Sequence, residues 1–95
     1  MSRYYPDEMT TDLHEILGRS ASACRELANL FRAVGVTIAP RADAEQAAAL
    51  HWLLRIYLDH GSQWRYFAAT EIERMRNGEL PVGASALGEG VSSHD

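Results

Sequence analysis

The chain has 95 residues, of which 46% are apolar and 23% are charged, and its formal net charge at neutral pH is −4. These values are typical of one small globular domain and exclude a wholly disordered chain. The negative charge argues against a protein devoted to nucleic acid or to an anionic membrane surface. The single cysteine, Cys24, excludes an internal disulfide and a thiolate metal cluster. We therefore expect a cytoplasmic protein, with neither a signal peptide nor a membrane span.

The first expected helix covers residues 7–34. It opens after Pro6 on two acidic residues, a favourable start, with Thr10 or Thr11 as alternative caps. From Leu13 onward, apolar or small residues recur at alternating steps of four and three, as in a heptad repeat. Gly35 follows the last of them and is the expected stop. The seam so defined consists of Leu13, Leu17, Ser20, Cys24, Leu27, Phe31 and Val34.

The second expected helix covers residues 43–77. Asp43 and Gln46 have the spacing of a capping box at its start, and Gly78 is the expected stop. The repeat passes through Gly61 without a change of phase, which favours one continuous helix, although a break at this glycine stays open. The expected seam consists of Ala47, Leu50, Leu54, Tyr57, Gly61, Trp64, Ala68, Ile72 and Met75.

These patterns predict an all-α fold: an antiparallel hairpin of two long helices within residues 1–77, followed by a flexible tail over residues 78–95 that is rich in Gly and Ser. The second helix carries a further apolar strip that one hairpin partner cannot cover. Its main members are Trp52, Ile56, His60 and Phe67. We expect this strip to be the interface of a homodimer in a four-helix arrangement. A different protein partner, or a monomeric three-helix bundle broken at Gly61, are the alternatives.

The sequence lacks the motifs that would indicate catalysis or metal binding. It contains no E-x-x-H or H-E-x-x-H motif, no phosphate-binding loop and no dinucleotide fingerprint. The four histidines do not pair at the three- or four-residue spacing of helical metal ligands. We therefore expect no enzyme activity, no cofactor and no metal. The favoured function is a non-catalytic protein–protein interaction module, acting as a small adaptor, inhibitor or regulator.

Two alternatives depend on arginine. A nucleic-acid-associated regulator would use the Arg clusters of a helical dimer, since Arg interleaved with aromatic residues can hold phosphate and stack on bases. The candidates for such polar contacts are Arg65, Tyr66, Arg74 and Arg76. Neighbouring glutamates make a salt-bridged helix end the preferred explanation, so nucleic acid is an unlikely partner. A weaker alternative is a small helical enzyme with a site at the dimer interface.

Overall fold

The computed structural model describes residues 5–80, and within this range the ordered elements are all helical. They are α1 (Thr11–Leu17), α2 (Ala21–Ala33), α3 (Ala42–His60), the 3₁₀ turn η1 (Gly61–Gln63) and α4 (Trp64–Arg76). The prediction of an all-α fold is confirmed. The prediction of two long helices is wrong, because each expected helix is broken once. Residues 81–95 of the predicted tail lie outside the described residues.

The first expected helix is broken between α1 and α2 by a side-chain cap. Gly18 ends α1, and its N–H donates to the carbonyl oxygen of His14 at 2.9 Å. Ser20 then adopts an extended backbone, and its Oγ accepts a hydrogen bond from the N–H of Ala23 at 3.2 Å. Such a cap satisfies a backbone donor that has no partner inside the helix. Ser20 therefore starts α2 and is exposed, rather than contributing to a continuous apolar seam.

The starts of α1 and α3 also differ from the first expectation. Thr10 caps α1, since its Oγ1 accepts from the N–H of Leu13 at 3.0 Å, so this helix begins well after Pro6. The alternative start at Thr10 is thus confirmed. The capping box at Asp43 is wrong, because α3 already begins at Ala42. The Asp43 carboxylate instead accepts a hydrogen bond from Nε of Arg41 at 3.1 Å.

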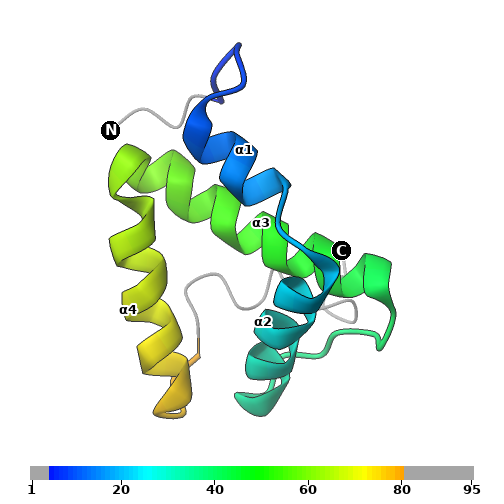
Figure 1. Ribbon diagram of the computed structural model, residues 1–95. Helices are drawn as coiled ribbons and strands as arrows, with labels where there is room; N and C mark the ends of the chain where they lie inside the picture. Colours follow the sequence, from blue (N-terminus) through cyan, green and yellow to red (C-terminus); the bar gives the residue numbers. More distant parts are fainter. Residues whose placement is uncertain (1–4, 81–95) are drawn as a thin grey trace, which may run out of the picture.

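The second expected helix is broken at Gly61. This glycine has φ 59° and ψ −135°, a backbone conformation that residues with a Cβ rarely adopt. The chain makes one 3₁₀ turn there, and α4 then leaves α3 in a new direction (Figure 1). The rings of His60 and Phe67 stack across this corner with centroids 3.6 Å apart. The continuous helix is therefore wrong, and the alternative of a break is confirmed.

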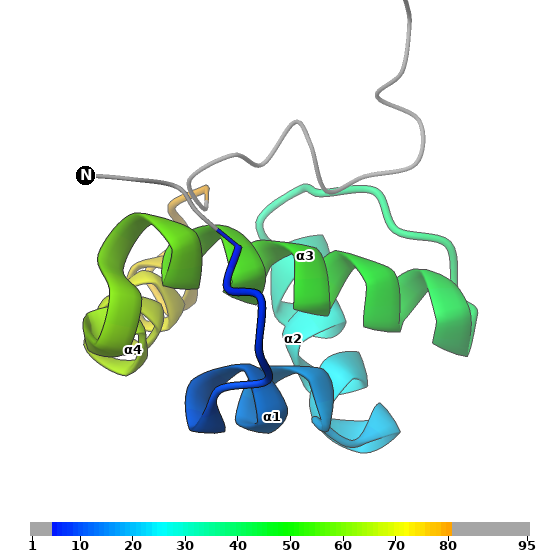
Figure 2. The same ribbon diagram turned by 90° about the horizontal axis from the view of Figure 1, so that it is seen from above.

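Helix α3 forms the centre of the fold. Helices α1 and α2 pack along one side of it, while α4 turns away from its C-terminal end (Figures 1 and 2). At the α2–α3 contact, the rings of Phe31 and Trp52 meet edge to face with centroids 5.5 Å apart. Trp52 and Ile56 are only 2% and 8% exposed. The core therefore lies on the face of α3 that was expected to need a second molecule.

This burial corrects the reasoning behind the expected interface. The chain's own core encloses Trp52 and Ile56, and Phe67 packs against that core, so these side chains need no partner to leave water. The seam expected for α3 is out of phase, since Ala47 is exposed and Leu50 is half-buried. In α4 the expected seam is correct at its buried positions, which are Trp64, Ala68 and Met75. The homodimer stays a prediction that now lacks its original support.

An ion cluster around the buried carboxylate of Glu45 links α2, the segment after it and the start of α3. Glu45 is 4% exposed, and its carboxylate accepts hydrogen bonds from Arg25 at 3.3 Å and Arg32 at 3.0 Å. Arg32 also donates to the carbonyl oxygens of Ile38 and Ala39 at 3.1 and 3.0 Å. Burial alone would raise the pKa of Glu45, but the bonds from Arg32 and Arg25 outweigh it and hold this pKa below its ordinary value. The carboxylate thus stays ionised and holds the connection in place.

Candidate functional site

A groove lies between α2 and α4, which extend from α3 toward the same side of the molecule (Figure 1). Its volume is about 360 Å³. Most of its lining residues are apolar, and five are charged. The lining residues are Glu15 and Arg19 before α2; Ala23, Glu26, Leu27 and Leu30 in α2; Leu53 in α3; and Trp64, Arg65, Ala68, Ala69, Ile72 and Arg76 in α4.

Each wall of the groove is one stripe of a helix. The α2 wall follows the steps of four and three that place Ala23, Leu27 and Leu30 on one face. The α4 wall follows the same spacing through Ala69 and Ile72. Small alanine side chains on both walls leave room for another backbone to approach closely. The groove is thus bounded on each side by one helical stripe.

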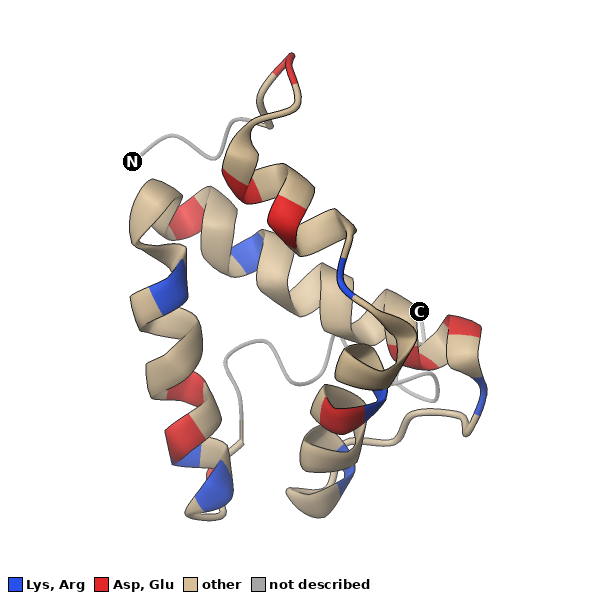
Figure 3. Cartoon of the chain, viewed as in Figure 1, with Lys and Arg blue, Asp and Glu red and all other residues tan. Residues whose placement is uncertain are grey.

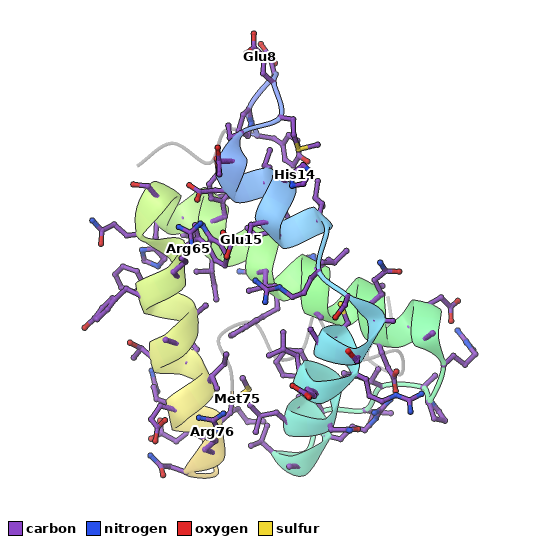
Figure 4. All side chains as sticks on the ribbon, viewed as in Figure 1. Glu8, His14, Glu15, Arg65, Met75 and Arg76 are labelled. Carbon is purple, nitrogen blue, oxygen red and sulfur yellow. The ribbon has the colours of Figure 1, made fainter. Side chains whose placement is uncertain are left out.

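An ion cluster joins α1 to α4 at one end of the groove. Arg65 forms ion pairs with Glu15 and, at 3.1 Å, with Asp12. Figure 4 places the labelled side chains of Glu15 and Arg65 beside each other where α1 meets α4. The guanidinium of Arg65 also lies over the Trp64 ring, 4.8 Å from its centroid. Hydrogen bonding from Arg65 lowers the pKa of Glu15, so this carboxyl group remains ionised and keeps its ion pair with Arg65.

Two polar groups lining the groove have no hydrogen-bond partner. Nε of Arg19 and Nε1 of Trp64 are both buried, and no described residue accepts a hydrogen bond from either. Trp64 is 2% exposed, so water does not replace the missing acceptor on its ring. A buried donor without an acceptor is costly, and the cost is relieved when an acceptor arrives. The core holds such a donor too, Nε1 of Trp52, so an unpaired indole N–H is not peculiar to the groove; among the described arginines, Arg19 alone has a buried donor without a partner.

The sequence-predicted site residues are not gathered at one place. Trp52 and Ile56 lie in the core, while His60 and Phe67 stack at the corner between α3 and α4. Tyr66 is 67% exposed and does not line the groove.

The predicted arginine cluster is divided among carboxylates. Arg74 pairs with Glu71 at 3.4 Å and with Glu79 at 2.8 Å, and Arg76 pairs with Glu73 at 3.5 Å. Along α4, the acidic residues Glu71 and Glu73 lie between Arg65 and the pair Arg74 and Arg76, so charges of both signs lie on this helix (Figure 3). Arg65 and Arg76 do line the groove, at opposite ends of α4.

Sequence reasoning missed Arg19 and the groove itself. Arg19 lies in the short connection between α1 and α2, within the range 7–34 that was expected to be one continuous helix. Of the residues on the α2 wall, Leu27 belongs to the apolar seam that the sequence predicts. The direction of α4, which turns this stripe into one wall of a groove, depends on the backbone at Gly61 and has no signal in the apolar pattern.

Residues 5–80 contain no group of three or more His, Cys, Asp and Glu residues arranged to hold a metal ion. Burial raises the pKa of the Cys24 thiol, which keeps it protonated and poorly nucleophilic. No helix within this range is long and apolar enough to cross a membrane. No protein-family model, no curated protein and no solved structure matches this chain.

Proposed function

We propose that this protein is a non-catalytic interaction module, a small adaptor, inhibitor or regulator, and that it binds a helix of a partner protein in the groove between α2 and α4. The observation that carries the proposal is the groove's construction from two helical stripes with an apolar floor. Amphipathic helices bind in grooves of this kind through apolar side chains spaced three and four residues apart.

The dimensions of the walls support a helical partner. Helices α2 and α4 have 13 residues each. The residues that line the groove span 23–30 in α2 and 64–76 in α4, so at a rise of 1.5 Å per residue the two walls are about 12 Å and about 20 Å long. A partner helix of about 13 residues would therefore cover the groove and place three or four apolar side chains over Leu27, Leu53 and Ile72.

The nucleic-acid alternative has weaker support. Arg65, Arg74 and Arg76 each have a carboxylate within 4 Å, so a phosphate would have to compete with these pairs. The enzyme alternative has no activated nucleophile among the groove residues, since Cys24 is buried outside the groove. The groove therefore favours recognition over catalysis.

Site-specific crosslinking tests the proposal. Cys24 is the sole cysteine of the chain and is buried, so a cysteine introduced at the surface can be labelled selectively. Ala69→Cys places a photo-crosslinker on the groove wall, and Ser62→Cys places the same label on the exposed η1 turn as a matched control. In the source cell lysate, we expect one protein to crosslink to position 69 and not to position 62. Equal crosslinking at both positions, or crosslinking to nucleic acid alone, would contradict the proposal.

A further inference from the structure

We infer that the partner helix carries an acidic side chain, whose carboxylate pairs with the guanidinium of Arg19 at the α1 end of the groove. This inference rests on the proposed function and names the chemistry of the partner. It starts from two buried donors without acceptors, Nε of Arg19 and Nε1 of Trp64, which belong to residues that line the same groove. Both are N–H groups, so the missing group is a hydrogen-bond acceptor.

The charges around this end of the groove indicate that the acceptor is anionic. Arg65 already engages the carboxylates of Glu15 and Asp12. Arg19 influences Glu15 only through space, as a nearby positive charge that lowers its pKa. No described carboxylate lies within ion-pair distance of Arg19, so its positive charge is left over once the pairs are made. A partner carboxylate would both accept the hydrogen bond and neutralise this charge, and such charge-assisted bonds are the stronger kind.

The position of Arg19 makes it accessible to a partner. The residue as a whole is half-buried and lies outside the regular helices, between the end of α1 and the N-cap of α2. Its long side chain can therefore turn its guanidinium toward a docked helix without disturbing helical hydrogen bonds. Trp64, by contrast, is held in the core with Arg65 over its ring. The side chain of Arg19 can thus change conformation to meet a partner, whereas the N–H group of Trp64 is held in place.

A selection from a helical peptide library tests the inference on the full-length chain. The probe is a displayed library of 14-residue amphipathic helices, with an apolar stripe held constant and the flanking positions randomised. It is selected in parallel against the wild-type protein, Arg19→Gln, Arg19→Lys and Ala69→Glu. Circular dichroism first establishes that each variant has the helix content and melting temperature of the wild type.

On the wild type, we expect enrichment of Asp or Glu at one flanking position of the binders. The best synthetic peptide should bind about tenfold or more tightly than its Glu-to-Gln version, the size expected for a charge-assisted bond. This difference in affinity should disappear with the Arg19→Gln protein. It should persist in part with Arg19→Lys, which keeps the positive charge but lacks the planar guanidinium group. Ala69→Glu should abolish binding, which locates the peptide in the groove.

Other outcomes separate this inference from the proposed function. Binders that depend on Ala69 but show no acidic preference, or the same preference on Arg19→Gln, would overturn the inference and leave the groove as the docking site. A library that yields no binder sensitive to Ala69→Glu would overturn the proposed function itself. Displacement of the selected helix by a synthetic peptide of residues 81–95 would assign the groove to the chain's own C-terminal segment and overturn the separate acidic partner.

Discussion

The two contacts of α2 differ sharply. Toward α3, this helix forms a closed interface, in which Phe31 meets Trp52 and a buried carboxylate fastens the connecting segment. Toward α4, the same helix leaves an open groove, whose walls include the small side chains of Ala23 and Ala69. Each contact holds a buried indole N–H without an acceptor, that of Trp52 in the first and that of Trp64 in the second, but only the groove adds an unpaired arginine donor, Nε of Arg19. We therefore expect stability to come mainly from the α2–α3 contact, and the proposed recognition of a partner helix concerns the α2–α4 groove.

The largest expected loss of stability comes from removing a large side chain from the α2–α3 contact. Trp52→Ala removes a side chain that is 2% exposed and packed against Phe31. Losing a buried aromatic residue should lower the free energy of unfolding by about 3–5 kcal/mol, a large part of the stability of a small domain. Urea titration followed by circular dichroism measures the loss. Tyr66→Ala, at an exposed position, is the matched control and should change stability by less than about 0.5 kcal/mol.

The next effect concerns the glycine that sets the direction of α4. Gly61→Ala introduces a Cβ at φ 59°, where no neighbouring atom lies within 4 Å, so the penalty comes from the backbone alone. We expect a loss of about 1–3 kcal/mol, seen as a lower melting temperature. A continuous helix would give the opposite sign, because alanine is the better helix former. A higher melting temperature for Gly61→Ala would therefore exclude the break, and with it the groove.

Acid should weaken the closed contact through Glu45. The pKa of this carboxyl group is lower in the folded protein than its ordinary value of 4.5. Its contribution to stability is therefore fully present above about pH 4.5 and is lost as the pH falls through the lower, folded pKa. We expect Glu45→Gln to be less stable than the wild type at pH 7, and this difference to shrink as the pH falls below 4.5.

Thermal unfolding at several pH values measures this effect in the wild type and in Glu45→Gln. Glu15 and Asp43 also have lowered pKa values, so both proteins should lose some stability in acid. A difference between them that stays constant from pH 7 to pH 3 would show that the Glu45 carboxylate does not stabilise the fold through its charge.

The smallest expected change in stability is that of a substitution in the open groove. Ala69 is exposed on its wall, so Ala69→Glu should change the free energy of unfolding by no more than about 0.5 kcal/mol. The same change places a charged side chain over the apolar floor and should abolish docking of a helix. Calorimetric melting and peptide binding, measured on the same preparation, separate the two effects. A large loss of stability would assign Ala69 to the core rather than to a docking surface.

Much of the local structure could be predicted from the sequence. The all-α class follows from the apolar spacing, and the stops after α2 and α4 follow from Gly35 and Gly78, which both have positive φ. The buried positions of α4 also follow from the heptad. These features depend on residues close together in the chain, which is where sequence patterns carry information.

The two helix breaks could not be predicted from the sequence, because neither of them shifts the phase of the apolar repeat. Ser20 and Gly61 both occupy seam positions, so the heptad continues through them while the backbone does not. Once α1 and α4 change direction, the face of α3 that is buried changes too, and Trp52 and Ile56 become core. The groove was hidden for the same reason, since its two walls come from helices whose relative direction depends on these breaks.

Chemical-shift mapping of methyl groups tests the central claim most directly. The full chain, labelled at Ile, Leu and Val methyl groups, is titrated with the selected acidic helix peptide. The groove methyl groups of Leu27, Leu30 and Ile72 should shift, while those of Ile38 and Ile56 in the closed core should stay unchanged. Shifts at Ile38 and Ile56 with an unaffected groove would contradict the division between a stabilising contact and a recognition surface.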